Sequence, residues 1–134
     1  MNAQKTAVTC AVVLSFVLLA SSVFAQSPRP KPGDNVAAKW TNGSYYSAMV
    51  TGTDGGQYNV LYEDGEKGQV DGSGVVVIQA DAPIKVGDHV LACWKSAQMF
   101  PGVVVAKTDY TYTVKWDDGD APLEVARGRV VLHP

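Results

Sequence analysis

The sequence has few of the residues that build catalytic, metal and redox sites. Its 134 residues include only two histidines and two cysteines. His89 and His133 are far apart in the chain, and neither belongs to a metal-ligand spacing. We expect His89 on a strand surface and His133 in a frayed end. The neighbouring carboxylates Asp117 and Asp118 do not complete the ligand spacing of a calcium loop. We therefore expect no cofactor, no metal and no enzymatic activity.

Cysteine is too scarce for a disulfide framework. Cys10 lies in the N-terminal apolar run, which leaves Cys93 as the single thiol after that run. Cys93 occupies a strand position where the first half of the chain has Lys39. We interpret it as a structural residue, and a reactive thiol or an intermolecular bridge is the alternative.

Long apolar stretches are confined to the N-terminus. Lys5 precedes an apolar run from Thr6 to Ala20, and small residues follow as far as Ala25. This pattern is typical of a cleaved signal peptide, so we expect residues 1–25 to be removed and the chain to be exported, to the periplasm or the extracellular space. An uncleaved anchor is the alternative, because Thr6–Ala25 is about long enough to span a bilayer.

After signal removal we expect no membrane span and a monomer or weak oligomer. Mass spectrometry of the exported protein should show a chain that begins at Gln26, and an intact Met1 would contradict the assignment.

Strong charge of either sign is also missing, since the formal net charge is −2. Nucleic acid is therefore excluded as an expected partner.

An internal duplication is the main positive feature of the sequence. Residues 33–78 align without a gap with residues 87–132, and thirteen of the 46 aligned positions are identical. The clearest pair is Tyr58–Gly65 and Tyr112–Gly119, each an alternating run that ends in Asp-Gly. We predict a Pro-rich spacer at 26–32, one domain at 33–79, a linker at 80–86 and a second domain at 87–133.

Neither copy shows the 3.6-residue apolar period of a helix, and each reads as five short strands. In the first copy the expected strands are Asn35–Trp40, Tyr45–Thr51, Gln57–Tyr62, Gly68–Asp71 and Val75–Gln79. In the second they are His89–Trp94, Met99–Lys107, Thr111–Trp116, Leu123–Ala126 and Arg129–Leu132. Five short strands in about 50 residues bury their inward faces by curling into a small barrel. The sequence therefore predicts an all-β fold of two tandem five-stranded barrels.

The motif Gly-Asp-x-Val-x-Ala-x-Trp, followed after a Val-rich strand by Tyr/Trp-x-Asp-Gly, occurs in both copies. It resembles the Tudor and Agenet group of SH3-like barrels. The resemblance implies a cage of aromatic rings with an acidic residue at its edge, which in that group binds methylated lysine or arginine. By position, the two candidate cages are Trp40, Tyr46, Tyr62 and Asp64, and Trp94, Phe100, Trp116 and Asp118. Where many members have a fourth aromatic wall, this chain has Gly68 and Pro122, so each cage would be open on one side.

Two functions follow from these patterns. The first is an exported, non-enzymatic binding module with a peptide or protein partner, in which the strand-end aromatics recognise a cationic peptide or methylated amine. The second is a structural or assembly protein of the cell envelope, in which the same aromatics are barrel core. Residues 33–78 carry two basic and six acidic side chains, which gives a formal net charge of −4. Residues 87–132 carry five basic and six acidic side chains, which gives a formal net charge of −1. If the rings bind a cation, the first barrel is therefore the stronger site.

Overall fold

The structure, a computed structural model, describes residues 28–134. The predicted signal peptide and the first two residues of the predicted spacer lie outside this range. Within the described part of the chain, no helix is both long and apolar enough to cross a membrane.

Each of the ten predicted strands is present, and all pair in antiparallel fashion. Their bounds are β1 Asn35–Lys39, β2 Tyr45–Asp54, β3 Gln57–Tyr62, β4 Lys67–Asp71, β5 Val75–Val77, β6 His89–Cys93, β7 Gln98–Lys107, β8 Thr111–Trp116, β9 Leu123–Ala126 and β10 Val130–Leu132. A single turn of 3₁₀-helix precedes β5 and another precedes β10. The predicted all-β fold is confirmed.

The two copies share one topology. In the first, the strands are ordered β5-β1-β2-β3-β4, and in the second β10-β6-β7-β8-β9. A β-bulge bends β2 between Val50 and Gly52, and its counterpart bends β7 between Val104 and Ala106. Each bulge lets one long strand pair with a different neighbour at each end, which curls the sheet around its core. The duplication seen in the sequence is thus repeated in the backbone.

Each barrel has its own hydrophobic core, built from the inward face of the predicted alternation. Val36, Ala38 and Val60 are buried in the first, as are Val90 and Val114 in the second. The segment between the barrels also contributes, because Ile84 is buried in the second core. Side chains on alternate residues of a strand share a face, so the period of two in the sequence accounts for these buried positions.

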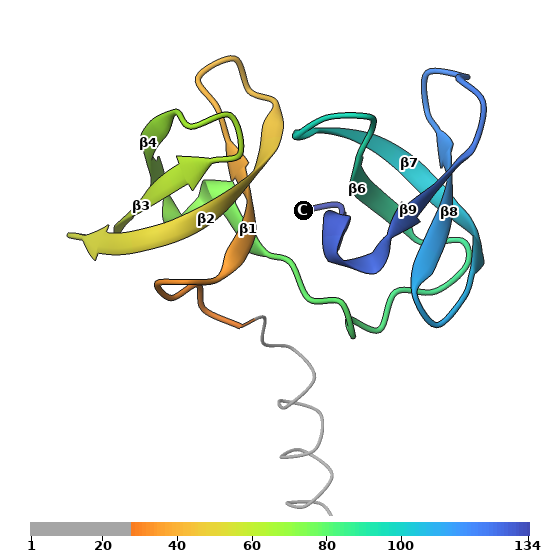
Figure 1. The fold of residues 1–134 in the computed structure, drawn as a ribbon, viewed down its shortest axis with the longest axis horizontal. Helices are drawn as coiled ribbons and strands as arrows, with labels where there is room; N and C mark the ends of the chain where they lie inside the picture. The colour runs from red at the N-terminus through yellow and green to blue at the C-terminus, as the bar shows by residue number, and fades with distance from the viewer. Residues whose placement is uncertain (1–27) are drawn as a thin grey trace, which may run out of the picture.

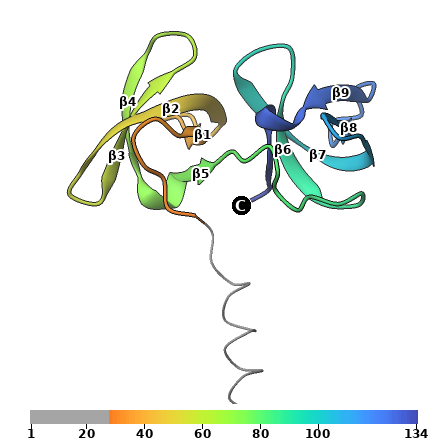
Figure 2. The same ribbon diagram turned by 60° about the horizontal axis from the view of Figure 1, so that its bottom comes forward.

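The barrels lie side by side and are joined through their sheets (Figure 1). Strand β2 pairs with β7 through Tyr45 opposite Met99 and Tyr46 opposite Gln98. The Ser47 amide donates to the carbonyl of Ala97 at 2.8 Å. The ten strands therefore form one continuous hydrogen-bonded sheet. The turned view shows the connection from β5 running across to β6 (Figure 2).

A third hydrophobic core fills the space between the barrels. It contains Ala37, Ile78, Leu91, Cys93, Met99 and Val131, with Tyr45 and Val76 packed against it. Ala37 and Leu91 lie on the faces of β1 and β6 that alternation alone would expose to solvent. They are buried because each barrel covers the outer face of the other. Strands buried on both faces read as continuous apolar runs, and Val36-Ala37-Ala38 and Val90-Leu91-Ala92-Cys93 are such runs.

Candidate functional site

Three aromatic rings of the first barrel converge at one end of its strands. Trp40 follows β1, Tyr46 lies in β2, and Tyr62 ends β3. The Tyr62 ring packs edge-on against the other two, with centroids 4.9 Å from Trp40 and 6.3 Å from Tyr46 and interplanar angles of 86° and 89°. These rings, with Asp64, line a recess of about 280 Å³. The structure thus brings together the four residues of the first candidate cage.

Tyr62 is the most buried residue of this recess, and its ring is fixed by packing and by a hydrogen bond. Its side chain is buried, and its hydroxyl donates to the carbonyl of Lys39 at 3.0 Å. Burial, and secondly the charge of Asp64, raises the pKa of Tyr62 above its ordinary value. The phenol therefore stays neutral and remains a donor. Asn42 Nδ2 donates to the Tyr46 hydroxyl at 3.4 Å, so two of the three rings are oriented by hydrogen bonds.

Acidic side chains stand at the edge of the recess. Asp64 and Glu66 both line it, and both are exposed. The Glu66 amide donates to Asp64 Oδ1 at 3.0 Å, which fixes the turn between β3 and β4. Glu63, which precedes Asp64 in the chain, is not among the residues that line the recess. It forms an ion pair with Arg129 of the second barrel at 3.2 Å, because adjacent residues at the end of a strand point in opposite directions.

The second barrel contributes one residue to the lining of this recess. Ala97, in the turn between β6 and β7, lines the recess with the aromatic rings. Gly68, at the position of the missing fourth wall, does not line this recess, and a Cβ there would lie 2.8 Å from Cε2 of Tyr62. Ala97 was missed by sequence reasoning, which treated each copy separately. Its contact depends on pairing between β2 and β7, for which the sequence carries no local signal.

The second barrel holds its three candidate rings at the equivalent strand ends. Trp116 is 3% exposed and belongs to the core, with its indole nitrogen lacking a hydrogen-bond partner among the described residues. Trp94 and Phe100 pack edge-to-face on that core, with centroids 6.0 Å apart. Asp118 accepts from the Asp120 amide at 2.9 Å and fixes its own turn.

A lysine of the second barrel already occupies the face of its tryptophan. Lys95 Nζ lies 4.8 Å from the centroid of the Trp94 ring, within the range of a cation–π contact. Lys95 also has a φ of 59°, a left-handed conformation that is uncommon for a residue other than glycine. The first copy has Thr41 at the equivalent position. The second barrel thus supplies an internal cation where the first has an open recess.

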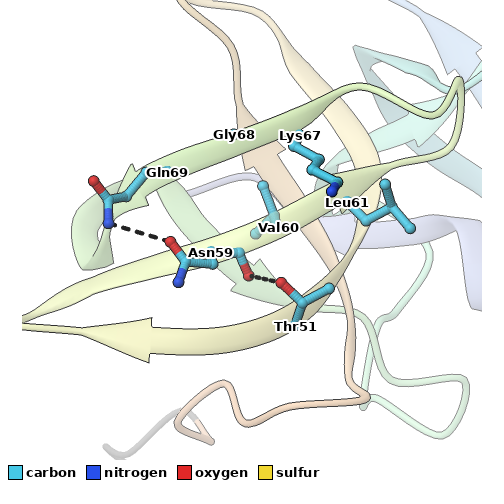
Figure 3. Close-up of a pocket in the computed structure, with 7 residues that line it drawn as sticks. All are labelled: Thr51, Asn59, Val60, Leu61, Lys67, Gly68 and Gln69. Carbon is cyan, nitrogen blue, oxygen red and sulfur yellow. Dashed lines mark hydrogen bonds between the residues drawn. The ribbon is translucent and has the colours of Figure 1, made fainter.

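A larger recess of about 520 Å³ lies on the outer side of β3 and β4 (Figure 3). Its wall includes a ladder of polar side chains, in which Gln69 Nε2 donates to Asn59 Oδ1 at 3.2 Å. The Thr51 hydroxyl, at the β2 bulge, donates to the Asn59 carbonyl at 3.2 Å. These groups satisfy one another, and no candidate aromatic residue lines this recess. We attribute it to the twist of the hairpin.

The two histidines meet in the fold although they are far apart in the sequence. Their rings stack with centroids 5.1 Å apart, and His89 Nε2 lies 2.9 Å from Asp117 Oδ2. His133 is not frayed as expected, since its amide donates to the His89 carbonyl at 3.0 Å and extends the pairing of β10 with β6. Within residues 28–134, no group of three or more His, Cys, Asp or Glu side chains is arranged to hold a metal.

Cys93 lies in the third core and is buried. Burial raises the pKa of its thiol to about 11, against a smaller opposing effect of Arg129. A thiol nucleophile reacts as the thiolate, so this environment favours the structural interpretation of Cys93.

Comparison with known proteins places the chain in a family. No curated protein matches it. Similar solved structures include ADCP1 tandem Agenet domain 3-4, at 20% identity over 78% of this chain and 81% of that one, with a TM-score of 0.45. Arabidopsis thaliana AGDP1 AGD34 has 20% identity over 78% of this chain and 83% of that one, with a TM-score of 0.47. The SAWADEE domain of Arabidopsis thaliana SHH1 has 13% identity over 78% of this chain and 99% of that one, with a TM-score of 0.36.

One family model, described as a domain of unknown function (DUF4537), matches residues 33–132 and so runs through both barrels. The chain belongs to this DUF4537 family.

Proposed function

We propose that the chain is a non-enzymatic binding module that captures a cationic group, such as a lysine or methylated-lysine side chain of a peptide or protein, in the recess of its first barrel. The observation that carries the proposal is the convergence of Trp40, Tyr46 and Tyr62 on one recess with Asp64 and Glu66 at its edge. Export, predicted from residues 1–25, remains part of the proposal.

The chemistry of the recess suits a cation better than an anion or a neutral apolar group. Ring faces attract ammonium groups by about 0.5–2 kcal/mol for each good contact. The two carboxylates add a favourable field and offer acceptors to any N–H that the cation carries. A volume of about 280 Å³ lies just below the range of roughly 300–1,000 Å³ that holds whole drug-sized molecules. The recess therefore fits the end of one side chain.

The first barrel is the proposed site and the second is not. The first copy is the more acidic by sequence, −4 against −1. In the second, Lys95 already lies over the Trp94 ring. A ligand cation would have to displace Lys95 before it could reach Trp94.

The test is titration of the whole chain with a short peptide that carries one lysine, either unmethylated or trimethylated. Trp40→Ala should weaken binding by about tenfold or more, in line with the loss of one ring wall. Trp94→Ala is the matched control, because Trp94 is the aligned and similarly half-buried residue of the second barrel. This control should bind as the wild type does.

Added salt should weaken binding as well, because the acidic edge is exposed and charges separated by more than about 8–10 Å are screened at physiological ionic strength. If Trp40→Ala bound as well as the wild type, or if salt had no effect, the cation site would be wrong. The aromatics would then return to the alternative role, as core of a structural or assembly protein.

A further inference from the structure

We infer that Ala97 of the second barrel is a specificity-determining wall of the recess in the first, so that the two barrels together form one cation site. This inference rests on the proposed function and adds to it. It predicts a binding stoichiometry of one cation for each chain, and a limit on the size and shape of the group that enters.

The first step is the position of Ala97. Its carbonyl accepts from the Ser47 amide at 2.8 Å, and the next residue, Gln98, pairs with Tyr46. Tyr46 is itself a wall of the recess. Two backbone interactions therefore hold the β6–β7 turn against the ring that it neighbours, and the Ala97 methyl group is fixed relative to the aromatic walls.

The second step is that Gly68 gives the recess no wall. A Cβ at Gly68 would lie 2.8 Å from Cε2 of Tyr62, and Gly68 does not line the recess. The recess is lined by five residues of the first barrel and by Ala97 of the second.

The third step is the chemistry of the wall. Ala97 presents a methyl group, which can pack against the methyl groups of a quaternary ammonium but offers no acceptor to an N–H. The charged acceptors among the lining residues are Asp64 and Glu66. A methylated cation gains apolar contact with Ala97, while an unmethylated ammonium loses water on the Ala97 side without a replacement hydrogen bond. Ala97 should therefore favour the methylated form.

The arrangement also explains why the tandem has one site. In the second barrel, Lys95 lies over the Trp94 ring. The two barrels have diverged in role: the first supplies rings and acids, and the second supplies a wall. The family match, which spans residues 33–132 in one model, agrees with the tandem as the unit.

The experiment compares wild type with Ala97→Leu, using the trimethyl-lysine and unmethylated peptides with calorimetric titration of the whole chain. Leucine should fill part of the recess and weaken the trimethylated peptide by about tenfold or more, a size effect typical of apolar pockets. The unmethylated peptide should lose less, so the ratio of the two affinities should fall. The wild type should bind one peptide for each chain.

Ala121→Leu is the control, because Ala121 is an exposed residue between β8 and β9 and does not line the recess. It should leave both affinities unchanged. Ala97→Gly provides a second variant that cannot overfill the recess, and it should lower the ratio of the two affinities without a large change in thermal unfolding.

Affinities unchanged in both Ala97 variants, or two peptides bound for each chain, would overturn this inference while leaving a cation site in the first barrel intact. Failure of the wild type to bind either peptide would instead overturn the proposed function itself. The two failures are therefore distinguishable in one set of titrations.

Discussion

At the scale of single residues, Cys93 shows how the contact between the barrels changes the chemistry of a side chain. Its thiol is buried in the third core and lies 3.7 Å from the Ala97 carbonyl, to which it donates. The structural interpretation of Cys93 agrees with this buried position. The sequence does not predict the depth of burial, because part of the cluster, including Ala37 and Ile78, comes from the first barrel and is distant in the chain.

The stability of the protein should depend on the ionisation of Cys93 at alkaline pH. Burial raises the thiol pKa from 9.0 to about 11, so the folded state binds its proton more tightly than the unfolded state. The resulting stabilisation, on the order of 2–3 kcal/mol, is present below the unfolded pKa. It is lost progressively as pH rises from 9 to 11.

Denaturant unfolding at pH 8 and pH 10.5 under reducing conditions measures this effect. Cys93→Ala is the control, because it keeps a small apolar group in the third core and removes the titrating proton. The wild type should lose more stability than Cys93→Ala over this range. Equal losses would show that other groups, Tyr62 among them, account for the alkaline destabilisation.

At the scale of elements, the sequence predicts nearly all of the strands and misses what joins them. The Asp-Gly turns at Gly65 and Gly119 have φ values of 94° and 89°, as turn residues with positive φ require. Alternation in β1 and β3 predicts that Trp40 and Tyr62 share a face, and their rings are in contact in the structure. The sequence does not predict that Ala97 lines the recess, because the pairing of strands from different barrels is set by packing rather than by local propensity.

The packing of β4 against β3 gives a prediction at this scale. Gly68→Ala should destabilise the protein by about 1–3 kcal/mol, the usual cost of overpacking, since the new Cβ would lie 2.8 Å from Tyr62 Cε2. It should also displace the Tyr62 ring and weaken cation binding. Gly128→Ala is a matched control in the 3₁₀ turn of the second barrel, where a Cβ meets nothing within 4 Å and the backbone is not left-handed.

Thermal unfolding and near-ultraviolet circular dichroism measure the two effects. Gly128→Ala should be neutral, or should stabilise by roughly 0.4–1 kcal/mol through the unfolded chain. If Gly68→Ala were equally well tolerated, the Tyr62 ring would have room to move. The Tyr62 wall of the recess would then be adaptable rather than rigid.

At the scale of the whole molecule, the third core decides whether the barrels are independent. Small domains bury a limited fraction of their surface, about 60% at 60 residues, so a barrel of this size is only marginally stable alone. Ala37, Leu91 and Val131 are buried where the barrels meet, and the β2–β7 pairing adds hydrogen bonds. The duplicated sequence suggests two units, whereas the packing argues for a single cooperative one.

Cooperative unfolding can be tested with the tryptophans as reporters. In a Trp40→Phe background the remaining tryptophans, Trp94 and Trp116, both lie in the second barrel. Val60→Ala removes a buried group from the first core and should cost about 1–3 kcal/mol. If the third core couples the barrels, this substitution should lower the denaturation midpoint that the second-barrel tryptophans report.

Val105→Ala is the control for this experiment. Val105 is 44% exposed, so its substitution should leave the midpoint unchanged. A midpoint unaffected by Val60→Ala would mean that the barrels unfold separately. Ala97 would then line the recess of the first barrel only while β2 and β7 remain paired.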